Sequence, residues 1–213
     1  MIKGYYFITD AGLSKNGNLS DVRNAVEAGV NIVQYRSSIG DPDAMLVEAK
    51  ELRKVCKGRP LFIVNDMVDV AIAIDADGVH IGQGDMSYEE ARGLLGKNKI
   101  IGVTVHDIKE AIAAEKKGAD YLGVSPIFLT GTKEDAGKPC GTELIIEVKK
   151  NCNIPIVAIG GIDLDNAKQV IVAGADALCA ISAVVTKDDV KGEIGKFQGL
   201  FEQKRKGATC FMK

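Results

Sequence analysis

Hydrophobic and polar positions repeat along the chain in one recurring order. A stretch with apolar residues at helical spacing ends in glycine, and then come a small apolar residue, an Asp or Asn, and a short apolar run. Gly29, Gly118 and Gly174 fit the position just after a helix, where a left-handed backbone favours glycine. The order therefore predicts helices that are each followed by a strand. It occurs in EAGVNIVQ (27–34), KKGADYLGV (116–124) and VAGADALCA (172–180).

The same pattern, followed over the whole chain, predicts an α/β fold. Strands that alternate with helices imply parallel pairing, and eight such units in 213 residues favour a (β/α)8 TIM barrel. We expect a single domain over residues 1–213, with a loose C-terminal tail at about 207–213. The alternative is an open doubly wound sheet, but TDAGLSKNG after the first strand lacks the glycine fingerprint of that fold. The predicted strands lie near 4–9, 31–35, 61–65, 78–81, 100–104, 120–124, 155–159 and 176–181, and the clearest helical patterns at 21–28, 42–56, 108–118 and 165–174.

Composition narrows the class of protein. Hydrophobic residues make up 46% of the chain and aromatic residues only 5%, so the core must consist mostly of Val, Ile, Leu and Ala, which suits buried parallel strands. The formal net charge of -2 gives no sign of a nucleic-acid or membrane partner. The 5 cysteines lack zinc-binding spacing, and we interpret them as reduced thiols of a cytoplasmic protein. We expect neither a signal peptide nor a membrane span.

Polar residues gather just after the predicted strands. In a TIM barrel these positions meet at one rim, the carboxyl-end face on which active sites lie. Each residue alone has an ordinary alternative as a turn former or loop cap, but their convergence predicts a functional site. Among them we expect His80 to be a buried, hydrogen-bonded structural residue, and we assign neither His80 nor His106 as a general base. The set is Gln34, Arg36, Asn65, Asp66, His80, Gln83, Asp85, Thr104, His106, Ser125, Gly160, Gly161 and Ser182.

Two carboxylates, Asp66 and Asp85, follow the third and fourth predicted strands. Carboxylates on neighbouring strand ends suit Mg²⁺, which takes oxygen ligands and keeps several waters. For Asp66 the alternative is to cap the N-terminus of the helix that follows. For Asp85 it is to place a negative charge near a helix N-terminus.

The longest stretch without periodicity is SPIFLTGTKEDAGKPCGTE (125–143). Long loops in compact domains are usually functional or disordered, and a plain solvated loop is the alternative here. Thr130, Thr132 and Lys133 offer hydroxyls and a cation to phosphate oxygens. AIGGID (158–163) and AIS (180–182) end the seventh and eighth strands, whose following loops form the usual phosphate site of TIM barrels. Glycine there lets the backbone approach an anion closely.

A series of motifs occurs in a fixed order along nearly the whole chain: YYFITD (5–10), QYR (34–36), ND (65–66), DGVHIGQGD (77–85), GVTVHD (102–107), PIFLTGTK (126–133), IPIVAIGGI (154–162) and AISAV (180–184). In this order the motifs resemble one family, the thiamine phosphate synthases. Their combination is far more specific than any one of them.

The resemblance implies a fold, an activity and residue roles. The fold would be a βα barrel, and the enzyme would be a transferase that joins hydroxymethylpyrimidine diphosphate to a thiazole phosphate and releases pyrophosphate. Asp66 and Asp85 match the ligands of Mg²⁺, the implied cofactor. The pyrimidine diphosphate site would comprise Gln34, Arg36, Ser38, Asn65, Thr104 and Lys133, with Arg36, Thr104 and Lys133 acting in catalysis. The thiazole phosphate site would comprise Thr130, Gly131, Thr132, Gly160, Gly161, Ile181 and Ser182.

The sequence departs from the family pattern at several positions. Ser38 stands where the family usually has lysine, so one cation for the diphosphate is missing. Thr104 replaces a serine, and Asp107 replaces a threonine and adds negative charge near the rim if it faces inward. Two alternatives stay open: a thiazole tautomerase on a similar barrel, and a non-catalytic barrel that binds phosphate ligands. The partners implied are the two small phosphorylated substrates, and the oligomeric state, including a homo-oligomer, is left open.

Overall fold

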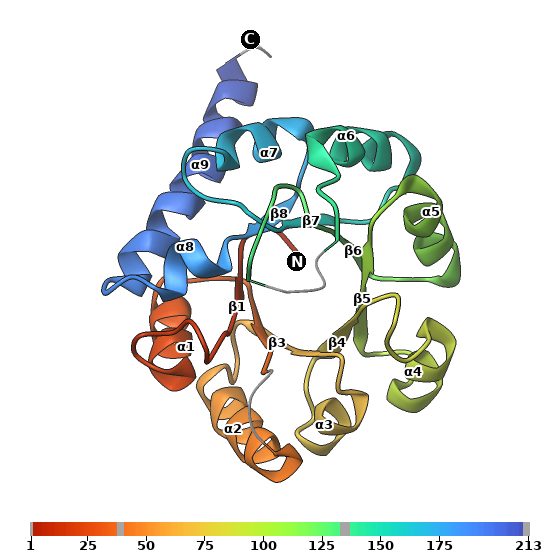
Figure 1. Cartoon of the computed structure of the whole chain (residues 1–213), viewed down its shortest axis with the longest axis vertical. Helices are drawn as coiled ribbons and strands as arrows, with labels where there is room; N and C mark the ends of the chain where they lie inside the picture. The colour runs from red at the N-terminus through yellow and green to blue at the C-terminus, as the bar shows by residue number, and fades with distance from the viewer. Residues whose placement is uncertain (1, 38–40, 133–136, 211–213) are drawn as a thin grey trace.

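The structure is a computed structural model that describes residues 2–37, 41–132 and 137–210. Over these residues eight parallel strands close into a barrel in chain order, with β8 pairing back onto β1. Viewed down the barrel, the strands form an inner ring that the helices surround (Figure 1). The TIM-barrel prediction is confirmed, and the doubly wound alternative is wrong because the first and last strands are hydrogen-bonded to each other.

The strands coincide closely with the predicted ones. They are β1 (Gly4–Ile8), β2 (Ile32–Tyr35), β3 (Leu61–Asn65), β4 (Gly78–Ile81), β5 (Ile100–Val105), β6 (Tyr121–Val124), β7 (Ile156–Ile159) and β8 (Ala177–Cys179). The helices described are α1 (Asn18–Glu27), α2 (Pro42–Val55), α3 (Val68–Ala73), α4 (Tyr88–Leu95), α5 (Ile108–Lys117), α6 (Gly141–Asn151), α7 (Ala167–Ala173), α8 (Ile181–Val185) and α9 (Val190–Cys210).

The eighth strand is the clearest difference in boundary. The sequence predicts a strand over 176–181, but β8 ends at Cys179 and the helix α8 begins at Ile181. The apolar run continues unbroken through this turn, and periodicity alone does not separate a buried strand from a short buried helix. The change of direction brings Ile181 and Ser182 to the carboxyl end of the barrel.

Helix ends follow the chemistry predicted from the sequence. Gly29, Gly118 and Gly174 have φ of 75, 102 and 118°, the left-handed conformation expected after each helix. α2 begins at Pro42, and the side chain of Asp41 caps it by accepting hydrogen bonds from two backbone N–H groups of the first turn. These local signals set where each helix stops, and so where the next strand can start.

The barrel interior is packed rather than hollow. Its apolar filling consists of Ile2, Tyr6, Ile8, Ile32, Ile63, Tyr121, Val157, Ala177 and Cys179. A larger apolar layer lies between the strands and the surrounding helices. Burial of each large side chain contributes roughly 1.5–3 kcal/mol, so this filling holds the strand ends in fixed positions. Polar groups are therefore collected at the carboxyl end, above the packed layers.

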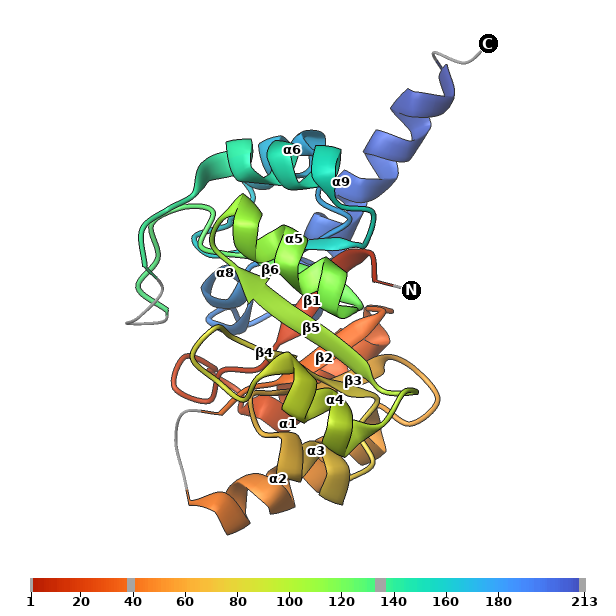
Figure 2. The same cartoon turned by 90° about the vertical axis from the view of Figure 1, so that its right-hand side faces the viewer.

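α9 is the last of the described helices. Its first half packs against the barrel, with Val190, Ile194 and Phe197 buried, and its C-terminal end projects away (Figure 2). It continues to Cys210, through the first residues of the segment expected to be a loose tail, 207–213, and residues 211–213 lie outside the described part. Among the described helices, none combines the length and apolar character needed to cross a membrane.

Candidate active site

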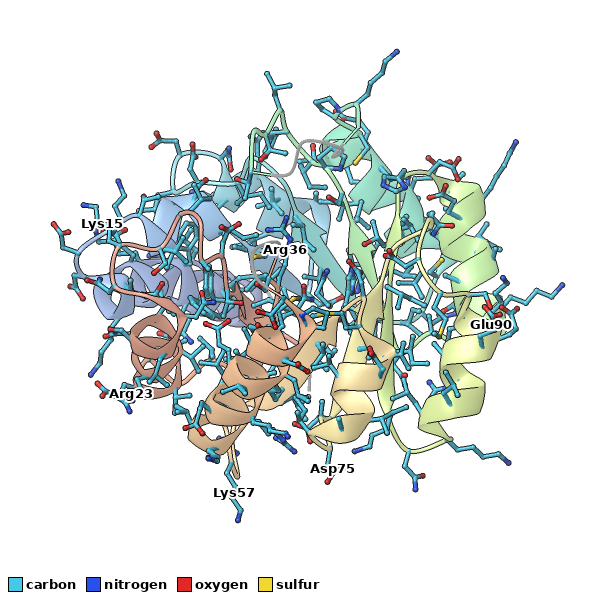
Figure 3. All side chains as sticks on the ribbon, turned by 60° about the horizontal axis from the view of Figure 1, so that its bottom comes forward. Lys15, Arg23, Arg36, Lys57, Asp75 and Glu90 are labelled. Atoms are coloured by element: carbon cyan, nitrogen blue, oxygen red, sulfur yellow. The ribbon has the colours of Figure 1, made fainter. Side chains whose placement is uncertain are left out.

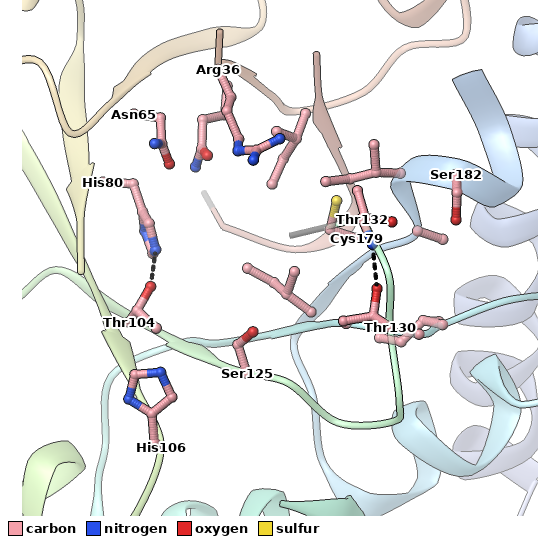
Figure 4. Close-up of a pocket in the computed structure, with 18 residues that line it drawn as sticks. Arg36, Asn65, His80, Thr104, His106, Ser125, Thr130, Thr132, Cys179 and Ser182 are labelled. Atoms are coloured by element: carbon pink, nitrogen blue, oxygen red, sulfur yellow. Dashed lines mark hydrogen bonds between the residues drawn. The ribbon is translucent and has the colours of Figure 1, made fainter. Parts of the chain in front are cut away.

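The carboxyl ends of the strands surround one cavity, which contains about 860 Å³ of empty space with its open mouth included. Apart from His106 at its edge, its polar side chains and glycine turns fall into two groups that face each other (Figure 4). The first, which we call the β2–β5 side, consists of Gln34, Arg36, Asn65, His80 and Thr104. The second, the β6–β8 side, consists of Ser125, Thr130, Thr132, Gly160, Gly161 and Ser182.

Arg36 carries positive charge into the centre of this cavity. Figure 3 shows it inside the ring of strands, whereas the other labelled charged residues lie at the periphery. Its Nη1 donates to Oδ2 of Asp10 at 2.8 Å, and the side chains of Arg36 and Asp10 are only 17% and 9% exposed. Thr9 Oγ1 donates to the Arg36 carbonyl and accepts from its backbone N–H, both at 2.9 Å. The end of β1 therefore fixes both the backbone and the guanidinium of Arg36.

Strand alternation directs Gln34 and Arg36 into the cavity and the residue between them away from it. Tyr35 is fully buried on the outer face of the barrel, where its hydroxyl donates to Glu48 Oε2 of α2 at 2.8 Å. Successive side chains of a strand point to opposite faces, which is why the sequence motif QYR places its two polar members together. The predicted orientation of Gln34 and Arg36 is confirmed.

Neither Asp66 nor Asp85 acts as a helix cap. The cap position of α3 is Met67, and α4 is capped by Ser87 through a capping box with Glu90. Asp66 adopts a φ of 61°, a left-handed conformation that residues other than glycine rarely adopt. Strained backbone of this kind is typical of functional positions. The capping alternative is therefore wrong for Asp66, whereas Asp85 lies just before the cap of α4, near the N-terminus of that helix.

The donor set of Asp66 and Asp85 fits Mg²⁺. Asn65 Nδ2 donates to Asp66 Oδ2 at 2.5 Å, and the Gly82 amide donates to Asp85 Oδ2 at 2.7 Å, so both carboxylates are oriented by neighbours. Asp85 lines a separate groove between α4 and α5. No group of three or more His, Cys, Asp or Glu side chains in the described part of the chain could hold a metal. Such carboxylates suit an ion that takes one or two of them and completes its shell with water and substrate phosphate. Neither Asp66 nor Asp85 lines the main cavity itself.

The two histidines differ in their surroundings. His80 is 4% exposed, and hydrogen bonds to both of its ring nitrogens confirm the predicted buried, bonded residue. His106 lies at the cavity edge, where its Nδ1 is 3.1 Å from Glu110 Oε2. Asp107 caps α5 by accepting from the Glu110 amide at 2.9 Å. Its carboxylate therefore serves the helix and does not face inward.

The β6–β8 side depends on two glycines after β7. Gly160 and Gly161 have φ of 101 and 63°, and a Cβ at Gly161 would lie 2.5 Å from the Leu129 carbonyl oxygen. The loop after β6 lies against this turn, because the amides of Ile127 and Phe128 donate to the carbonyls of Ile159 and Gly160. Glycine at these positions lets two backbones approach closely, which brings Thr130 and Thr132 over the cavity.

Gly161→Ala is expected to destabilise the fold by about 1–3 kcal/mol, because the new Cβ meets backbone at a left-handed position. Urea denaturation followed by circular dichroism measures the change. Gly93→Ala is the matched control, since a Cβ at Gly93 in α4 meets nothing within 4 Å. The control should be neutral or more stable by up to about 1 kcal/mol. An unchanged midpoint for Gly161→Ala would contradict this account of the turn.

The structure brings most of the predicted site residues to one place. Gly131 lines an adjoining groove that Thr130, Thr132, Gly161 and Ser182 also line. Ile181 lines the cavity together with Ser182. Ser38 and Lys133 lie outside the described residues.

Sequence reasoning missed several residues that shape the site. Asp10 and Thr9 hold Arg36 in place. Both are polar residues that directly follow a strand, so the same rule that pointed to Arg36 could have found them. Tyr6 and Tyr121 form part of the buried layer beneath the cavity. Their position in apolar strands gives no sequence signal that separates them from ordinary core residues.

The chain is similar in sequence and in structure to known proteins of one family. Residues 5–184 match the family described as thiamine monophosphate synthase. Thiamine-phosphate synthases of Methanosarcina barkeri and Methanosarcina mazei are 54% and 56% identical to the chain, over 95% and 91% of it and 92% and 80% of those proteins. The structure of thiamine phosphate pyrophosphorylase from Pyrococcus furiosus is 39% identical, with a TM-score of 0.86 over 94% of this chain and 96% of that one.

The chain belongs to the thiamine-phosphate synthase family. It is therefore a transferase of thiamine biosynthesis. Identities of this size over nearly the whole chain favour the synthase prediction over the tautomerase and the non-catalytic barrel. Residues that differ from the usual family pattern, such as Thr104, are therefore sequence variation in a thiamine-phosphate synthase.

Proposed function

We propose that the cavity couples hydroxymethylpyrimidine diphosphate with a thiazole phosphate, to give thiamine phosphate and pyrophosphate with Mg²⁺ as cofactor. The observation that carries this proposal is the division of one cavity into two polar sides. The β2–β5 side has the cation, the amides and the hydroxyl that suit a pyrimidine diphosphate. The β6–β8 side has the hydroxyls and glycine turns that suit a single phosphate.

Arg36 has the central electrostatic role in this proposal. When the methylene–oxygen bond breaks, negative charge grows on the departing pyrophosphate and positive charge on the pyrimidine methylene. A guanidinium that Asp10 and Thr9 already hold in place stabilises the leaving anion without reorganising during the reaction. Gln34, Asn65 and Thr104 would bind and orient the diphosphate and the pyrimidine on the same side.

Asp66 and Asp85 would hold the magnesium ion. When bound, the ion supplies further stabilisation of negative charge on the diphosphate oxygens. The chain's contribution is to fix the two carboxylates, through the Asn65 amide and the Gly82 N–H respectively.

No protein nucleophile is required, because the thiazole nitrogen forms the new bond to the methylene carbon itself. The β6–β8 side would hold the thiazole by its phosphate so that this nitrogen faces the methylene, a positioning effect. Cys179 lines the cavity, but burial raises the pKa of its thiol. It therefore remains a protonated, inert part of the lining.

The direct experiment is to incubate the protein with both phosphorylated substrates, with and without Mg²⁺, and to measure thiamine phosphate. Formation of thiamine phosphate that depends on Mg²⁺ is the expected result. If no product forms at saturating substrate, the proposed activity is wrong, and if product forms equally well after chelation, the magnesium assignment is wrong. We further propose that the enzyme works in the cytoplasm, in keeping with the free cysteines of its described part.

A further inference from the structure

A chain of hydrogen bonds crosses the barrel interior directly beneath the cavity. Gln34 Nε2 donates to the Tyr6 hydroxyl at 2.9 Å, and the Tyr6 and Tyr121 hydroxyls lie 2.8 Å apart. Tyr121 Oη is 3.0 Å from His80 Nδ1, and His80 Nε2 is 2.8 Å from Thr104 Oγ1 (Figure 4). Five strands contribute one residue each, so the chain joins Gln34 on β2 to Thr104 on β5. We call these five residues the tyrosine–histidine relay.

Two glycines make room for the relay. A Cβ at Gly102 of β5 would lie 2.0 Å from the Tyr121 ring, and a Cβ at Gly123 of β6 would lie 2.8 Å from the His80 ring. The rings of His80 and Tyr121 are stacked, with centroids 5.4 Å apart. The rings of Tyr121 and His80 therefore occupy the space that a side chain at Gly102 or Gly123 would need.

The relay has a direction, which the Gln34 amide sets. Its Nε2 donates to Tyr6. Every hydrogen of the relay then has an acceptor when Tyr6 donates to Tyr121 and Tyr121 donates to His80 Nδ1. The proton of the neutral imidazole then resides on Nε2 and is donated to Thr104 Oγ1.

The opposite order is unfavourable with Gln34 in this orientation. If His80 donated to Tyr121, one tyrosine hydrogen would have no acceptor among the described residues. An unpaired buried hydroxyl disfavours that order by about tenfold or more. Burial raises the pKa of both Tyr6 and Tyr121, so each keeps the hydrogen that it donates.

We propose that Tyr6, Tyr121 and His80 are positioning residues that fix His80 as the neutral Nε2–H tautomer and turn the Thr104 hydroxyl into a donor toward the cavity. Because Thr104 Oγ1 accepts from His80, its own hydrogen is free to point at the ligand. Diphosphate oxygens only accept hydrogen bonds, so a donor stabilises them, whereas a hydroxyl turned toward His80 would present its lone pairs to the anion. The ligand in this inference rests on the proposed function, but the tautomer does not.

Nitrogen-15 NMR of histidine-labelled protein tests the tautomer without any substrate. The chain has 2 histidines, and a His106→Gln variant assigns the two sets of signals. His80 is expected to show a protonated Nε2 and an unprotonated Nδ1, and Tyr121→Phe should convert this single form into a mixture. A protonated Nδ1 in the unsubstituted protein would overturn the proposal, even if the variant failed to fold.

A double-mutant cycle tests whether the relay acts through Thr104. Tyr121→Phe should lower kcat/KM for the pyrimidine diphosphate about tenfold, the effect of one lost hydrogen bond to a charged group. In a Thr104→Val background the same change should have less than about a twofold effect, because the residue on which it acts is gone. Tyr35→Phe is the control, since it also removes a buried tyrosine hydroxyl but one that faces Glu48 outside the barrel.

The two tests separate the possible failures. Equal losses from Tyr121→Phe in both backgrounds would mean that the relay is merely structural. Absence of thiamine phosphate with the expected His80 tautomer would refute the proposed function and leave the hydrogen-bond order intact. Normal synthesis with the other tautomer would refute only the relay.

Discussion

Arg36→Met should lower kcat/KM for the pyrimidine diphosphate by about 100- to 1,000-fold, the loss typical for one preorganised group that stabilises charge in a transition state. We expect a loss of this size because of where Arg36 lies: its side chain is only 17% exposed, and Asp10 holds its Nη1 at 2.8 Å. Methionine keeps much of the apolar stem and removes only the charge and its donors. Steady-state kinetics with each substrate varied in turn measures the loss.

Stability must be separated from activity in this variant. Removal of Arg36 leaves the Asp10 carboxylate, 9% exposed, without its cation, which should destabilise the fold by about 2 kcal/mol. The double variant Arg36→Met/Asp10→Asn should recover most of that stability and none of the activity.

Arg53→Met is the matched control for the lost arginine. Arg53 pairs with Asp77 through both of its terminal nitrogens, away from the cavity. The control should therefore keep full activity. If the double variant regained activity along with stability, Arg36 would be a structural residue only.

The fold was predictable because its signals are local. Glycines such as Gly118 and Gly174 set the helix ends, and each apolar run that follows them is short enough to be a strand. The end of β8 was not predictable, because the run through Ile181 is apolar in both its strand and its helix. Which of the two forms depends on closure of the barrel, a contact between the first and last strands that no local pattern encodes.

Part of the cavity lining was also predictable. Gln34, Arg36 and Thr104 are polar residues at strand ends, and the barrel topology alone brings them together. Tyr6 and Tyr121 were not predictable as partners, since 115 positions separate them and both lie in apolar strands. Strand pattern indicates that such residues are buried, but the inner and outer faces of a parallel strand are both apolar.

The second large effect concerns the metal. Asp66→Asn should reduce turnover by about 100-fold and weaken Mg²⁺ binding, because it removes a charged oxygen ligand while it keeps the shape of the side chain. Asp66 has a φ of 61°, and asparagine tolerates that conformation about as well as aspartate does. The fold should therefore survive the change. Calorimetric titration of Mg²⁺ into protein saturated with pyrophosphate measures binding independently of turnover.

Asp75→Asn provides the matched control for this variant. Asp75 has a φ of 50°, and it is with Asp66 one of the two non-glycine residues in the described part of the chain that have positive φ. Its carboxylate is 87% exposed and pairs with Lys99, so its charge contributes little to stability. The control therefore makes the same chemical change in the same backbone conformation, away from the cavity, and should bind Mg²⁺ normally. Equal Mg²⁺ affinity in both variants would exclude Asp66 as a ligand. Metal binding would then not explain its left-handed backbone conformation.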